Sequence, residues 1–156
     1  MEQLSLTLSV VTKATFVHRF PNAADGEAVV VANQGAAFPL SGRARRLDVV
    51  LRLRLAPITT GGAGEMTARL TSYVYQLSAA GGAEILAYHW HPGSAEARPH
   101  LHISAAAGSV LPELQRAHLP TGKVELAEFI RLLVRDFGVR PLRKDWRRVL
   151  GVSAQP

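Results

Sequence analysis

The sequence contains no cysteine. This absence excludes disulfide scaffolds, thiolate zinc sites and cysteine nucleophiles, so any metal must be bound by histidine and carboxylate side chains. No apolar run reaches the roughly 18 residues of a membrane-spanning helix, and Met1, Glu2 and Gln3 lack the basic region that begins a secretory signal. We therefore expect a protein of the cytoplasm that does not cross a membrane.

Several common catalytic motifs are also missing. The chain has no phosphate-binding P-loop, no dinucleotide-binding glycine fingerprint and no Gly-x-Ser-x-Gly nucleophile motif, which excludes the mechanisms that depend on them. The chain has 156 residues, of which 47% are hydrophobic and 19% charged, the composition of a folded globular protein. These values predict one domain over residues 1–156.

Positive charge exceeds negative charge. Lys and Arg number 18 against 12 Asp and Glu, which gives a net charge of +6 and favours anionic partners such as RNA. Basic residues concentrate near the C-terminus. Candidate contacts to an anionic substrate or nucleic acid are Arg143, Lys144, Arg147 and Arg148. The alternative is that this segment is only a solvated charged face.

Apolar residues that alternate with polar ones predict β-strands over much of the chain. The clearest case is the segment from Leu47 to Leu55. By this criterion and by strand-forming composition, strands are expected at residues 4–10, 27–32, 47–55, 66–77, 84–91 and 98–104. Residues 57–65 are expected to form a flexible connection, and Gly81 and Gly82 a hairpin turn.

The periodicity changes near the C-terminus. Apolar residues spaced as in one face of a helix predict an amphipathic helix within residues 124–137, which Gly138 should end. A short second helix is expected at residues 145–150. Strands followed by helices, without β-α-β alternation, predict an α+β fold: an antiparallel sheet of about five or six strands followed by the C-terminal amphipathic helix and the short second one.

Two His-x-His pairs provide the sharpest functional signal. Residues two apart on a strand point to the same face, so His89 pairs with His91 and His100 with His102. The alternate positions in both segments are apolar, which predicts that these positions face one core. If the two segments pair, all four histidines gather on the opposite face, joined by Arg98.

The histidine cluster fits more than one chemistry. It could bind one divalent metal, Zn, Ni, Fe or Mn, through His89, His91, His100 and His102, with Glu96 or His118 as a further ligand. Without metal, the same four histidines could act as general acid and base on a phosphodiester, and Arg98 would compensate the developing charge. A third alternative is a histidine face without chemistry in a domain that binds a protein partner.

Residues 73–138 also resemble the bacterial toxin proteins of the TumE type. The resemblance lies in the order Tyr88-His89-Trp90, then Pro99-His100-Leu101-His102, then a helix that begins near Val124-Glu125-Leu126 and ends at Phe137-Gly138. It matches His89, Trp90, His100 and His102. It implies the toxin of a toxin–antitoxin pair, which acts on RNA or the translation apparatus and is neutralised by a DNA-binding antitoxin.

These observations together predict a histidine-cluster hydrolase or nuclease-like protein that acts on an anionic substrate such as RNA. The alternatives are a non-catalytic metal- or ligand-binding module and a protein-interaction domain without chemistry.

Overall fold

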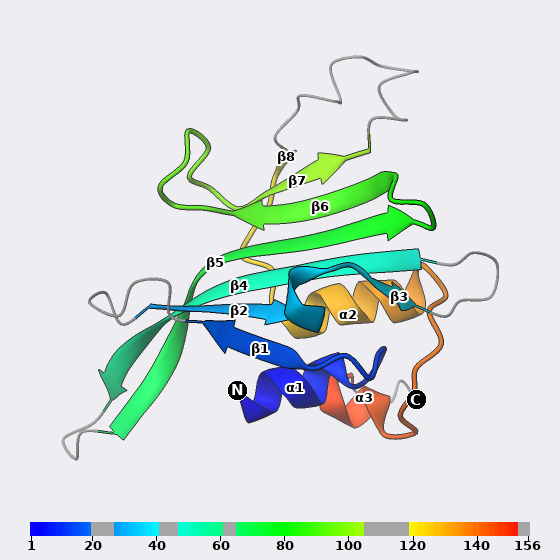
Figure 1. Cartoon of the computed structure of the whole chain (residues 1–156), viewed down its shortest axis with the longest axis horizontal. Helices are drawn as coiled ribbons and strands as arrows, with labels where there is room; N and C mark the ends of the chain where they lie inside the picture. The colour runs from blue at the N-terminus through cyan, green and yellow to red at the C-terminus, as the bar shows by residue number, and fades with distance from the viewer. Residues whose placement is uncertain (20–26, 41–46, 61–64, 105–118, 153–156) are drawn as a thin grey trace.

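The protein has an α+β fold in which one antiparallel sheet is covered on one face by helices (Figure 1). The computed structural model describes residues 1–19, 27–40, 47–60, 65–104 and 119–152. Within these residues the strand order is β1-β2-β4-β5-β6-β7-β8, and β3 also pairs with β4. Every neighbouring pair is antiparallel, so the predicted fold class is confirmed.

The elements are short apart from one central hairpin. The strands are β1 Phe16–Arg19, β2 Ala28–Ala32, β3 Phe38–Leu40, β4 Leu47–Thr60, β5 Glu65–Ala79, β6 Glu84–Trp90, β7 His100–Ile103 and β8 Leu119–Pro120. The helices are α1 Glu2–Leu8, α2 Leu126–Arg135 and α3 Trp146–Val149, with a 3₁₀ turn, η2, at Asn33–Gly35. The described residues thus form eight strands rather than five or six, because β1, β3 and β8 have only two to four residues each.

The long β4–β5 hairpin forms the middle of the sheet. Leu51 and Leu53 lie in the core, whereas Arg52 and Arg54, which alternate with them, are exposed on the other face, as the alternation predicts. The expected flexible connection is wrong at residues 57–60 and 65, since β4 and β5 remain paired as far as Thr60 and Glu65, and its residues 61–64 lie outside the described residues. Pairing continues because each strand supplies the backbone partners of the other.

The N-terminal segment is a helix, so the strand expected at residues 4–10 is wrong. Its leucines fit both periods: they alternate, but Leu4 and Leu8 also lie one helical turn apart. The helical arrangement buries Leu8 in the core, and the Thr7 hydroxyl donates to the Gln3 carbonyl oxygen at 2.9 Å. In so short a segment the period alone does not choose between strand and helix.

The C-terminal helices confirm the predicted stripe. Leu126, Phe129, Ile130 and Leu133 of α2 are all buried, and the Glu128 carboxylate accepts a hydrogen bond from the Glu125 backbone at 2.9 Å, at the start of the helix. Gly138, with φ of +66°, lies just beyond the end of α2. Such a left-handed residue is the usual helix stop. The short second helix is α3.

One continuous core lies between the helices and the sheet. Phe129 packs on Tyr75 with 5.3 Å between ring centroids, and Tyr75 stacks on Tyr73 at 4.5 Å. Both tyrosines are fully buried. The Tyr73 hydroxyl accepts a hydrogen bond from the Val124 backbone at 3.0 Å, which ties the segment before α2 to the sheet. In the part of the chain that the structure describes, no helix is long and apolar enough to cross a membrane.

Candidate metal centre

The two histidine segments are neighbouring strands. β6 and β7 pair antiparallel in a register that places His89 opposite His100 and Ala87 opposite His102. Tyr88 and Leu101, opposite each other, occupy the alternate positions, and Tyr88 packs on Phe129 of α2. Opposed residues share a face of the sheet. The histidines therefore lie on the face away from the helices, as the apolar alternation predicts.

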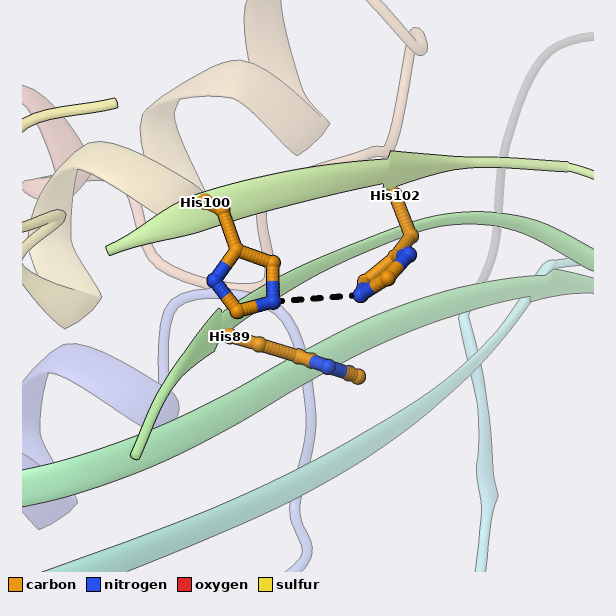
Figure 2. Close-up of side chains that lie close together, drawn as sticks. All are labelled: His89, His100 and His102. Atoms are coloured by element: carbon orange, nitrogen blue, oxygen red, sulfur yellow. Dashed lines mark hydrogen bonds between the residues drawn. The ribbon is translucent and has the colours of Figure 1, made fainter. Parts of the chain in front are cut away.

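Three of the histidines converge. His89, His100 and His102 can each offer one ring nitrogen such that these atoms lie within 4.8 Å of one another (Figure 2). The ring centroids of His89 and His102 are 4.8 Å apart, and those of His100 and His102 are 4.9 Å apart. His100 is only 4% exposed, whereas the other two rings are half-buried. The cluster is thus anchored at one buried imidazole and open at the other two.

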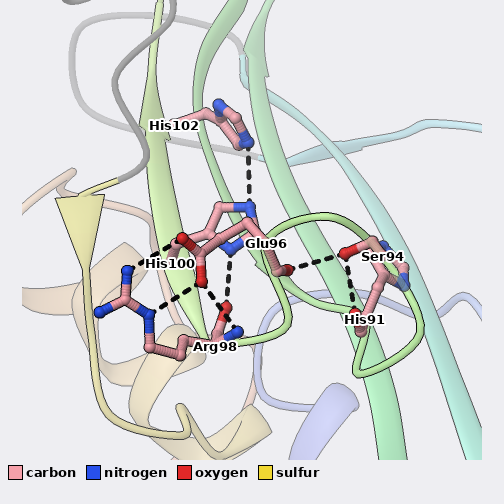
Figure 3. Close-up of polar contacts among 6 residues, drawn as sticks. All are labelled: His91, Ser94, Glu96, Arg98, His100 and His102. Atoms are coloured by element: carbon pink, nitrogen blue, oxygen red, sulfur yellow. Dashed lines mark hydrogen bonds and ion pairs between the residues drawn. The ribbon is translucent and has the colours of Figure 1, made fainter.

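The protonation of His100 follows from its hydrogen bonds. Its Nδ1 lies 2.8 Å from the carbonyl oxygen of Arg98 (Figure 3), and a carbonyl can only accept, so Nδ1 carries a hydrogen and donates it. In the neutral ring the lone pair is then on Nε2, which lies 3.1 Å from Nε2 of His102. His100 thus presents its lone pair to the middle of the cluster.

The contact between His100 and His102 also implies that metal binding displaces a proton. If His100 is neutral, His102 donates through its own Nε2 hydrogen. A metal at this point replaces that hydrogen, so the His102 proton must leave or move to Nδ1. Such proton release is usual when imidazoles become ligands.

The spacing is close to that of a metal site. Two nitrogens bound to Zn²⁺ at tetrahedral angles, each about 2.0–2.1 Å from the ion, are about 3.3–3.4 Å apart. The two Nε2 atoms at 3.1 Å are already near this spacing. A pair at the 4.8 Å limit must approach by about 1.4 Å. Rotation of the half-buried rings of His89 and His102 can supply such a movement.

His91 does not join this group. Its ring is 5.8 Å from that of His89, but the residue follows the end of β6 and begins a turn in which the Ser94 hydroxyl donates to the His91 carbonyl oxygen at 2.8 Å. Burial, and then the nearby His100 and Arg54, lower the pKa of His91. His91 instead lines an open pocket of about 510 Å³, together with Arg54, Ser72 and Ser94.

Glu96 and Arg98 are paired with each other rather than with the cluster. The guanidinium of Arg98 donates to both carboxylate oxygens of Glu96, at 2.9 and 3.0 Å (Figure 3), and this pairing lowers the pKa of Glu96 to about 2. Neither side chain belongs to the converging group in the described residues. Arg98 contributes its carbonyl oxygen to His100 instead. His118, a further predicted ligand, lies outside the described residues.

The predicted basic contacts at the C-terminus lie around α3, in the helical layer (Figure 1). Arg143 and Arg148 share the carboxylate of Asp145, with shortest N···O distances of 2.9 and 2.6 Å, and Arg147 lies over the ring of Trp146. These pairings reduce the charge that the segment offers to a ligand. A nucleic-acid contact there stays a prediction.

Comparison with known proteins adds no indication of function. No protein family, curated protein or solved structure matches the chain. The TumE-type resemblance is neither supported nor contradicted by this result, and the toxin role remains a proposal.

Sequence reasoning missed the arginines of the histidine face. Arg52 and Arg54 point to the same side of the sheet as the histidines, and Arg19 on β1 does so as well. The alternation in residues 47–55 already indicated which face Arg52 and Arg54 would take. The register across the three strands β4, β5 and β6, which the sequence does not provide, was needed to relate them to His89.

Proposed function

We propose that the protein is a metal-dependent hydrolase whose metal is held by His89, His100 and His102. The observation that carries the proposal is the orientation of His100, whose Nδ1 hydrogen is bound to a backbone carbonyl while its Nε2 faces the other two rings. Metal-binding histidines commonly use such a contact to fix the ring and its protonation.

The ligand set favours zinc. Catalytic zinc sites usually have three protein ligands, of which three imidazoles are one known set, and one open position, whereas structural sites are closed by four protein ligands. Manganese prefers oxygen ligands, and non-haem iron commonly uses a carboxylate beside two histidines. In the described residues the converging group contains only histidines. Nickel fits imidazole ligands too and is the second choice.

A metal held by these three histidines would supply a hydroxide nucleophile at neutral pH, because it would lower the pKa of a bound water towards 7. Of the described residues, His91 is the nearest further imidazole, with its ring 5.8 Å from that of His89, and it would accept the proton of that water. As the water oxygen forms its bond to the ester phosphorus or carbon, the bond to the leaving oxygen breaks. His91 then returns the proton to the leaving oxygen.

The alternative is acid–base catalysis without metal. It is favoured by the direct Nε2–Nε2 hydrogen bond between His100 and His102, which needs no ion and keeps one proton between two bases. The two mechanisms differ in their response to chelation. Only the metal-dependent one loses activity in EDTA and recovers it with zinc.

The test combines metal content with hydrolysis. Protein purified without chelator should contain near-stoichiometric zinc, and His102→Ala should weaken zinc binding by at least about 100-fold, more than the loss of an outer contact does. His18→Ala is the matched control, because His18 lies exposed on β1. The His91→Ala variant should keep the metal but hydrolyse bis(4-nitrophenyl) phosphate more slowly. Zinc binding that is equal in the wild type and His102→Ala refutes the proposal.

The toxin role is a companion proposal that rests on the resemblance alone. If the protein is such a toxin, its expression in a bacterial host should arrest growth. His102→Ala should relieve the arrest, and His18→Ala should not.

A further inference from the structure

The histidine face carries arginines in the same rows as the histidines. Across the sheet, Arg52 lies opposite Val74, Val74 opposite His89, and His89 opposite His100. Since neighbouring strands are about 4.8 Å apart, the backbone of Arg52 is about 10 Å from that of His89. Arg54 lies two residues further along β4, about 7 Å away. Arg19 on β1 lies in the same row as Arg54, since both pair with Val29.

These cations are available to a ligand. Arg19, Arg52 and Arg54 are all exposed. Within the described residues, no acidic side chain forms an ion pair with Arg19 or Arg52, and Arg54 has only a long contact of 3.4 Å with Glu27. Asp48 and Glu84, which share this face, lie in the row of Ser78 at the other end of the strands. The face is therefore positive on one side of the histidines.

The surface between the arginines is apolar. Val29 and Val31 of β2 and Val74 of β5 lie between or beside the arginine positions on the same face, and Val29 and Val74 are only half-buried. Arginine side chains around an apolar surface suit a ligand that has both phosphates and flat apolar rings. A nucleotide chain has both, because its bases stack on apolar and aromatic surfaces while its phosphates bind arginine.

A pocket connects the arginines to the cluster. Arg54 and His91 both line the open pocket of about 510 Å³, with Ser72 and Ser94. Ligand pockets of roughly 300–1,000 Å³ hold small molecules, so this one has room for about one nucleotide. Glu27 also lines it and accepts a hydrogen bond from the Thr71 hydroxyl at 2.5 Å. Its carboxylate competes with a phosphate for Arg54.

We infer that the histidine face binds single-stranded nucleic acid, with backbone phosphates on Arg19, Arg52 and Arg54 and the next phosphodiester at His89 and His91. This identifies the substrate class of the proposed hydrolase and rests on that function for cleavage. Binding itself needs only the arginine face and can be measured without metal. An exposed sheet is also a surface on which single strands, unlike a duplex, can splay their bases.

The experiment measures fluorescence anisotropy of a labelled single-stranded RNA with EDTA present, so that a failure of metal binding does not affect it. With three phosphate contacts, log K should fall with log salt at a slope of about −2, a loss of about 15-fold between 50 and 200 mM salt. Combined Arg19→Gln, Arg52→Gln and Arg54→Gln substitutions should remove most of this dependence.

A matched variant distinguishes the two basic surfaces. Combined Lys144→Gln, Arg147→Gln and Arg148→Gln substitutions remove the same charge from the helical layer and should leave most of the affinity. Glu27→Gln should act in the opposite direction and tighten binding by about two- to fivefold, the range expected when an exposed ion pair is removed. Equal melting temperatures check that each variant is folded.

Three results overturn the inference: no salt-dependent binding by the wild type, wild-type binding by the sheet-face variant, or equal affinity for duplex and single-stranded RNA. If only the variant at Lys144, Arg147 and Arg148 loses affinity, the nucleic acid binds the helical layer instead.

Discussion

Zinc should stabilise the folded protein measurably. The three candidate ligands come from two neighbouring strands, one from β6 and two from β7. A bound ion therefore links β6 to β7. A ligand that binds only the folded state stabilises it by RT ln(1 + [L]/Kd), which is about 2.7 kcal/mol when free zinc is 100 times Kd.

This free energy converts into a shift of the melting temperature. For a domain of about 150 residues, 1 kcal/mol corresponds to about 2–4 °C, so saturating zinc should raise the melting temperature by about 5–11 °C. Any affinity of zinc for the histidines of the unfolded chain reduces the shift in melting temperature, so this range is an upper bound.

The assay is thermal unfolding followed by circular dichroism, in zinc and in EDTA. The wild type and His18→Ala should show the full shift. His91→Ala should keep most of it, because His91 lies outside the converging group. His102→Ala should show almost none. His102 is the better choice than His100, which is only 4% exposed and whose loss leaves a buried gap.

The reasoning is refuted if His102→Ala keeps the zinc shift, or if His18→Ala abolishes it. The first result places the metal elsewhere. The second shows that zinc acts through scattered surface histidines.

Three further predictions concern the scaffold. Phe129→Ala should lower the free energy of unfolding by about 3–5 kcal/mol in urea denaturation, because the ring is fully buried against Tyr75 and Tyr88; an unchanged midpoint contradicts this packing. Gly138→Ala should cost about 1–2 kcal/mol in the same assay, since a φ of +66° strains any residue with a Cβ atom. Hydrogen bonds from Arg143 and then Arg148 lower the pKa of Asp145 to about 2. This stabilisation is therefore present at neutral pH and is lost as the pH falls from about 4 towards 2. Asp145→Asn should accordingly be less stable than the wild type at pH 7 but match it once the pH is well below 2, and a gap that persists there argues against the pairing.

The sequence predicted the structure correctly where the residues could bury their apolar side chains in only one type of secondary structure. Leu51 and Leu53 alternate with charged residues, and only a strand buries the first set while exposing the second. The same reasoning, applied to Tyr88 and Leu101, predicted that His89 and His100 share a face. It succeeded because a strand has only two faces. Once the apolar residues occupy the core face, the residues that alternate with them must lie on the opposite face.

Other features depended on contacts between distant residues. Leu4 and Leu8 fit a strand and a helix equally well, and only the core that receives Leu8 decides between them. Glu96 appeared as a ligand because of its type and spacing, whereas its pairing with Arg98 depends on the conformation of the β6–β7 connection. The orientation of His100 rests on one backbone carbonyl, which no residue pattern reports.

The most direct test of the three-histidine metal centre is X-ray absorption spectroscopy of the zinc-loaded protein. The account predicts zinc bound by three imidazole nitrogens at about 2.0–2.1 Å with one further light ligand, and loss of one imidazole contribution in His102→Ala. A coordination shell of oxygen ligands, or a spectrum that is the same in the wild type and His102→Ala, would contradict it.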